Sequence, residues 1–123
     1  MNMKVYISQP MAGLTKEQIE IDRENGIKVA RIYYPNCEIL PTYFEDYDTS
    51  KFTPLEYMAK CTEIMSQADV CFFLPCYYQS AGCRLEDHMA QVYGVKRMYL
   101  DFGVDAENLH EFVYEPIAIV REN

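Results

Sequence analysis

The hexapeptide DVCFFL, Asp69 to Leu74, gives the clearest strand signal in this chain of 123 residues. Five apolar residues follow one another without the polar alternation of a half-exposed strand, a pattern typical of a central strand buried on both faces. Strands of this kind belong to parallel sheets that are covered by helices on each side. The segments around it are therefore expected to alternate between strands and helices.

The residues upstream of this strand fit that alternation. Met3 to Ser8 (MKVYIS) is predicted to form a first strand. From Thr15, apolar residues at spacings of three and four predict a helix, which Gly26 weakens and Pro35 ends. A second, short strand is expected at Cys37 to Leu40. Together these segments predict a strand–helix–strand unit.

A second helix is expected just before the central strand. Thr53 is a good N-cap, Pro54 suits the first helical position, and Glu56 completes a capping box. The helix is predicted to run to about Ala68. The residues expected on its buried face are Leu55, Met58, Met65 and Ala68.

The alternation continues downstream. A third helix is expected to begin near Ser80 and to end at Gly94, followed by a strand at Lys96 to Leu100. A short helix is expected at Asp105 to Val113, and a possible fifth strand at Ile117 to Val120. The residues expected to point inward from the third helix are Leu85, Met89, Val92 and Tyr93.

This order of elements predicts one α/β domain over residues 1–123, a Rossmann-like three-layer sandwich with a four- or five-stranded, mainly parallel sheet. Ligands of open parallel sheets bind beyond the carboxyl ends of the strands. Three loops fall there, Gln9 to Leu14, Pro41 to Phe52 and Pro75 to Ala81. We therefore expect a small-molecule site between these loops.

Composition narrows the class of ligand. The net charge of −8 argues against binding to polymeric nucleic acid or to an anionic membrane. A small anion remains compatible, because a helix N-terminus binds phosphate without net positive charge. The opening MNMKVYIS is too short for a signal peptide, and no apolar run approaches the ~20 residues of a membrane span.

The cysteines and the polar clusters predict no metal site. The five cysteines are an odd number without a CxxC pair, which favours buried thiols in a reducing cytoplasm. An acidic cluster in the second loop is interpreted as solvated rather than cation-binding. The acidic cluster consists of Glu45, Asp46 and Asp48. His88 is expected to lie at the surface or in the core without a catalytic role, and His110 is expected to be solvated.

The stretch after the central strand, LPCYYQSAGCRLE, holds the residue that matters most for function. Glu86 follows a small-residue turn and lies on the predicted third helix. It is either an exposed helix residue, as most glutamates are, or the reactive group of a site at the strand ends. Likewise, Tyr6 is either a core aromatic or part of that site. The residues by themselves leave both pairs of alternatives open.

At this level the chain resembles a known superfamily, the nucleoside 2-deoxyribosyltransferases and 2'-deoxynucleoside 5'-phosphate N-hydrolases. The resemblance rests on Tyr6 with Gly13 seven residues later, on Asp69-Val70, and on Ser80-x-Gly82-x-x-x-Glu86. It is closest to a small, often phage-borne branch whose members read like YISGPM and LPGWxxSxGAxxE. It spans nearly the whole chain in order and spacing.

The resemblance implies an enzyme that cleaves or transfers the N-glycosidic bond of a deoxynucleoside or deoxynucleotide. Glu86 would be the nucleophile, kept ionised by a nearby helix N-terminus, and Tyr6 would orient its carboxylate. Ser80 and the amides near Gly82 would hold the sugar 5' end or its phosphate. The resemblance implies no cofactor. It does imply that the chain forms a homo-oligomer. The further residues expected to line the substrate pocket or stack on the base are Gln9, Gly13, Tyr43, Phe44, Tyr77 and Tyr78.

Three positions depart from the family pattern. Cys61 stands where the enzymes have an Asp that contacts the sugar, Gln9 replaces a glycine, and Ala12 replaces an Arg of the monophosphate hydrolases. Asp69, at the amino end of its strand, is interpreted as structural. The alternative hypothesis is therefore a non-catalytic nucleoside- or nucleotide-binding protein that retains the fold and pocket. A phosphoribohydrolase is disfavoured because a PGG-x-GT loop is absent.

Overall fold

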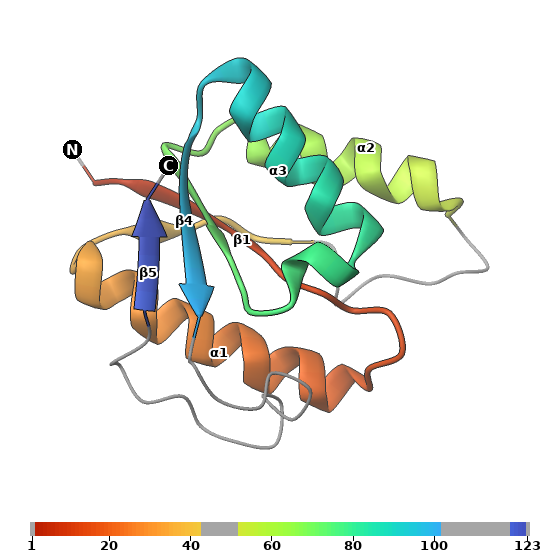
Figure 1. Ribbon diagram of the computed structural model, residues 1–123, viewed down its shortest axis with the longest axis horizontal. Coiled ribbons are helices and arrows are strands. Elements are labelled where there is room, and N and C mark those ends of the chain that lie inside the picture. The colour runs from red at the N-terminus through yellow and green to blue at the C-terminus, as the bar shows by residue number, and fades with distance from the viewer. Residues whose placement is uncertain (1, 43–51, 102–118, 123) are drawn as a thin grey trace.

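A computed structural model describes residues 2–42, 52–101 and 119–122 (Figure 1). Five strands form one sheet in the order β2-β1-β3-β4-β5. The first four are parallel, and β5 is antiparallel to β4, which confirms the mainly parallel sheet. The strands are β1 (Lys4–Ser8), β2 (Glu38–Ile39), β3 (Val70–Phe73), β4 (Lys96–Asp101) and β5 (Ile119–Glu122).

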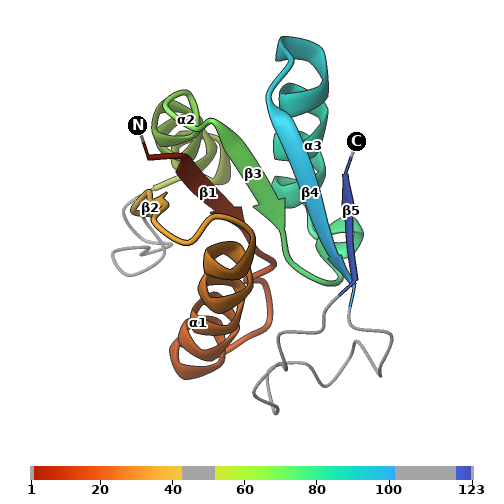
Figure 2. The same cartoon turned by 90° about the vertical axis from the view of Figure 1, so that its left-hand side faces the viewer.

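Helices cover both faces of this sheet, as expected for parallel strands joined by crossovers (Figures 1 and 2). Helix α1 (Lys16–Tyr33) packs on one face. Helices α2 (Pro54–Met65) and α3 (Ala81–Tyr93) pack on the other, and a short 3-10 helix, η2 (Tyr77–Gln79), precedes α3. The three-layer sandwich is therefore confirmed.

Strand β3 separates two apolar cores. Val70 and Phe72 pack toward α1, whereas Cys71 and Phe73 pack toward α2 and α3. All four side chains are 0% exposed. The alternation of side chains along a strand thus supplies both cores from one uninterrupted apolar run, as the sequence predicted.

Local signals place the helix starts. Thr15 and Thr53 each form a complete capping box, in which the threonine side chain and a side chain three residues later satisfy each other's backbone amides. The starts of α1 and α2 therefore fall where the sequence predicts them.

The end of α3 provides a test of backbone conformation. Gly94 has φ +75°, and no atom lies within 4 Å of the place where a Cβ would stand. Gly94→Ala should therefore lower the free energy of unfolding by about 1 kcal/mol through left-handed strain alone. Urea unfolding measures this loss. The exposed neighbour Gln91→Ala is the control and should change stability by less than about 0.5 kcal/mol; equal effects would contradict the assignment.

The predicted inward faces of two helices were partly wrong. On α2, Leu55 is 78% exposed, and Tyr57, Cys61 and Met65 are the buried residues. On α3, three residues expected inside are exposed, namely Leu85, Val92 and Tyr93. The residues of α3 that face the sheet are Cys83, Glu86 and Ala90. A stripe made of a thiol, a carboxylate and a methyl group does not give an apolar helical period, so the pattern pointed to the wrong face.

The remaining predicted elements lie near the C-terminus. The helix expected at 105–113 lies outside the described residues. The possible fifth strand is present as β5, shifted to Ile119–Glu122. No helix in the described part of the chain is long and apolar enough to cross a membrane.

The order of the strands locates the crevice. From β1 the chain passes through α1 to β2 on one side, and then through α2 to β3 on the other side of β1. The direction of winding thus reverses between β1 and β3. Ligands of open α/β sheets bind beyond the strand ends at such a switch point.

Candidate active site

Glu86 lies at this switch point, buried to 5% exposure between α3 and β1. The Tyr6 hydroxyl donates to its Oε2 at 2.5 Å, and the Ser8 hydroxyl donates to its Oε1 at 2.7 Å. Tyr6 and Ser8 are two apart on β1 and so share one face of the sheet. The interpretation of Glu86 as an exposed helix residue is therefore wrong.

Burial dominates the electrostatics of this carboxyl group. Desolvation raises the pKa of Glu86, and the hydrogen bonds from Tyr6 and Ser8 oppose that rise. The net shift is upward, although the helix N-terminus was expected to favour the ionised form. Glu86 is the sixth residue of α3, whereas the field of the free amides is strongest in the first turn.

Tyr6 and the neighbouring thiols stay protonated. Burial, and next the charge of Glu86, raise the pKa of Tyr6, so its hydroxyl remains a donor. The pKa of Cys61 is raised by burial and by Glu86, and its thiol interacts with the hydroxyls of Tyr6 and Tyr57. Burial also raises the pKa of Cys83, to about 11. The carboxylate is thus surrounded by neutral groups.

Four of the five cysteines have the buried positions expected of structural thiols: Cys37, Cys61, Cys71 and Cys83. Among the described residues, no group of three His, Cys, Asp or Glu side chains could hold a metal ion. His88 is exposed on α3. Within the described residues, the candidate reactive group is therefore the carboxyl group of Glu86.

The turn before α3 starts the helix near Ser80, as the sequence predicts. Ser80 caps the helix, and its Oγ accepts a hydrogen bond from the Cys83 amide at 3.2 Å. At Gly82, a Cβ would lie 3.2 Å from the sulfur of Met58 on α2. The space beside this glycine is therefore taken up by α2, and its contact with a ligand stays a prediction.

The loop after β1 has two features of note. Gly13 has φ +79° and is exposed, so its absent side chain serves the turn. Gln9 is 8% exposed and ties the loop to α1 by donating from Nε2 to the Ile19 carbonyl at 3.0 Å. Gln9 was predicted to line the substrate pocket, and this hydrogen bond fixes the orientation of its amide.

The candidate base-stacking residues divide into two groups. Tyr77 packs on Phe73 and Tyr99, with ring centroids 5.6 and 5.1 Å apart. Tyr78 is 57% exposed and meets Tyr77 edge to face, so it is the more accessible of the pair. The other candidates lie outside the described residues, as does the acidic cluster: Tyr43, Phe44, Glu45, Asp46, Asp48 and His110.

Sequence reasoning missed Ser8. Its signal was the period of two along β1, which places Ser8 on the same face as Tyr6 once that strand is accepted. Asp69 has the structural role expected of it, since its Oδ2 accepts from the Lys4 amide at 2.8 Å. A second carboxylate, Asp87, accepts from the Tyr99 hydroxyl and from Arg97, and so ties α3 to β4.

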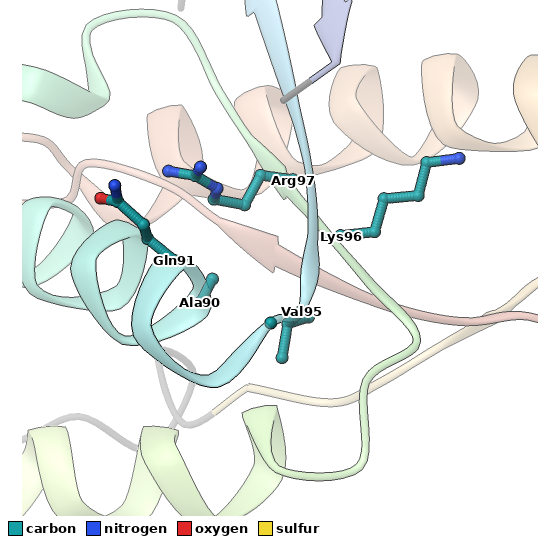
Figure 3. Close-up of a pocket in the computed structure, with 6 residues that line it drawn as sticks. Ala90, Gln91, Val95, Lys96 and Arg97 are labelled. Atoms are coloured by element: carbon teal, nitrogen blue, oxygen red, sulfur yellow. The ribbon is translucent and has the colours of Figure 1, made fainter.

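A shallow hollow of about 260 Å³ lies elsewhere, between the end of α3 and the start of β4 (Figure 3). Figure 3 shows Gln91 and Arg97 on one side of the strand and Lys96 extending to the other. It belongs to the amino edge of the sheet, whereas Ser8 ends β1 at the carboxyl edge. The hollow is therefore separate from the Glu86 site. Its lining residues are Ala90, Gln91, Gly94, Val95, Lys96 and Arg97.

Residues 3–99 match the model of a protein family described as a domain of unknown function, DUF4406. The match begins before β1 and ends within β4, so it includes Tyr6, Ser8 and Glu86. Comparison with curated proteins and with solved structures found no significant match.

Proposed function

The chain belongs to the DUF4406 family, and from that premise and the Glu86 site we propose that it cleaves or transfers the N-glycosidic bond of a deoxynucleoside or deoxynucleotide. The observation that carries the proposal is a carboxyl group, 5% exposed, with both oxygens held by hydroxyl donors at the switch point of a parallel sheet. Such preorganisation suits a nucleophile better than a solvated helix residue.

In the proposed reaction, Glu86 is the nucleophile of the first step and the leaving group of the second. One oxygen of its carboxylate bonds to C1 of the deoxyribose while the C1–N bond breaks, and its electron pair leaves with the base, which takes a proton from solvent. Water, or the nitrogen of a second base, then attacks C1 and releases Glu86. Tyr6 and Ser8 fix the plane of the carboxylate throughout, because each holds one of its oxygens.

A second candidate function, binding without turnover, is favoured by Cys61. Its protonated, buried thiol stands beside Tyr6 where the resembling enzymes carry a carboxylate for the sugar. A thiol is a weak hydrogen-bond acceptor, so contact with a sugar hydroxyl would be weaker. The cysteine usage and the resemblance further favour a cytoplasmic homo-oligomer.

Product analysis separates the two functions. The protein is incubated with deoxynucleosides and their monophosphates, with and without a second base, and free base is measured by chromatography. Base release, together with a glycosyl adduct on the peptide containing Glu86 in mass spectra, supports the enzyme. Tight binding of a deoxynucleoside without any released base would sink it in favour of the binding protein.

The pH dependence tests the two donors. Ser8→Ala removes a hydrogen bond that favours the ionised carboxylate, so the pKa of Glu86 should rise further. The acidic limb of the kcat/KM profile should then move to higher pH, and Tyr6→Phe should move it in the same direction. Ser66→Ala is the control, because the exposed Ser66 hydroxyl bonds only locally to the Glu63 carbonyl. If the acidic limb of the kcat/KM profile stays at the same pH in both Ser8→Ala and Tyr6→Phe, Glu86 is not the group whose ionisation that limb reports.

A further inference from the structure

The side-chain amide of Gln9 has a fixed orientation. Its Nε2 donates to the Ile19 carbonyl at 3.0 Å, which turns Oε1 the other way. That oxygen is buried, and no described residue donates a hydrogen bond to it. Leaving a buried acceptor unsatisfied costs about 1–3 kcal/mol. An unsatisfied acceptor in a residue only 8% exposed therefore needs an explanation.

Its position supplies one. Gln9 directly follows Ser8, which holds Glu86, and so lies at the carboxyl end of β1 beside the switch point. Thr42, shortly after the neighbouring strand β2, likewise has a buried hydroxyl without a hydrogen bond among the described residues. Two such groups thus follow adjacent parallel strands at the edge where ligands bind.

We propose that Gln9 Oε1 accepts a hydrogen bond from an exocyclic amino group on the base of the ligand. This rests on the proposed function, since it assumes that the sugar lies at Glu86. Because Nε2 is held by Ile19, the amide offers the ligand an acceptor and no donor. A base with a carbonyl in the same place would set two acceptors against each other. For an amino group at C6 of a purine or C4 of a pyrimidine, where guanine and thymine carry a carbonyl, the expected ligands carry adenine or cytosine.

The loop after β1 packs against α2. Met11, in this loop, has its sulfur 3.7 Å from the Tyr57 hydroxyl of α2, which closes the loop onto that helix. Opening this contact would expose the end of β1, and Gln9 Oε1 would gain its missing donor from the ligand. Gln9 Oε1 would therefore distinguish one base from another only when the ligand is bound.

Calorimetric titration tests the contact with ligands that differ by one amino group. The Glu86→Gln chain, in which the ligand is not consumed, is titrated with 2'-deoxyadenosine and with purine 2'-deoxyriboside, which lacks the amino group. Deoxycytidine and its 4-deamino analogue form a second pair. In one of the pairs, the amino-bearing ligand should bind about tenfold more tightly. In Gln9→Met the ratio should fall to about one, with affinity for the deamino ligand unchanged.

Each other outcome overturns the inference. Equal affinities in both pairs with Gln9 present, or a preference that persists in Gln9→Met, would show that Gln9 does not read the amino group. If Gln9→Met does not fold, Gln9→Gly gives the same readout. Equal base release from both members of each pair by the intact chain would reject the inference and leave the proposed function standing. Neither binding nor release with any of these ligands would reject both.

Discussion

Glu86→Gln is expected to lower base release by roughly 10⁴-fold or more, the scale seen when a nucleophile is removed, and to raise thermal stability at neutral pH. The amide has nearly the same shape but cannot form the ester intermediate. It also carries no charge, so it avoids the desolvation that raises the pKa of the buried Glu86 carboxyl group. Loss of activity would thus accompany a gain in stability.

The gain should depend on pH in one direction. The pKa of Glu86 is raised in the folded chain, whereas in the unfolded chain it is about 4.3. Stability of the unsubstituted chain should therefore fall as pH rises from that unfolded value through the folded one. At pH values above this window, the melting temperature of Glu86→Gln should be higher than that of the unsubstituted chain. At pH values below the window, the two melting temperatures should be equal. Each kcal/mol corresponds to roughly 3–6 °C for a domain of this size.

Melting curves and product assays across pH measure both effects on the same samples. Glu24→Gln, at an exposed position on α1, is the matched control and should alter neither quantity. Unchanged base release in Glu86→Gln would reject the nucleophile. A melting temperature lower than that of the unsubstituted chain at every pH would instead show that the two hydroxyl donors outweigh desolvation.

Phe72→Ala is expected to have the largest effect on stability, lowering the free energy of unfolding by roughly 3–5 kcal/mol. Phe72 is 0% exposed in the middle of the central strand, and its ring meets Tyr34 edge to face with centroids 6.1 Å apart. Its removal leaves a cavity between the sheet and α1. This loss is a large fraction of the ~5–15 kcal/mol that stabilises a typical domain.

Urea unfolding followed by circular dichroism measures the loss. Val92→Ala is the control, because Val92 is 59% exposed and its truncation should change stability by less than about 0.5 kcal/mol. A loss of under 1 kcal/mol in Phe72→Ala would contradict the assignment of this side chain to the core between β3 and α1.

The buried face of helix α3 was predicted wrongly because this face carries the candidate site. Glu86 lies on this face between Cys83 and Ala90, so a search for apolar periodicity selected Leu85 and Val92, which are exposed. Burial of a carboxyl group is unfavourable unless hydrogen bonds offset it, and sequence rules assume that it is avoided. Such local violations are expected where a fold carries a functional group.

The amino-acid sequence by itself determined the features with local causes. The apolar run of β3, the capping boxes at Thr15 and Thr53 and the glycine end of α3 all lie within a few residues of what produces them. Only the tertiary structure decided the site. The donors to Glu86 lie 80 and 78 residues away on β1, and the burial that raises its pKa comes from the packing of α3 against the sheet. Hydrogen bonding and desolvation depend on distance in space, which a single sequence does not contain.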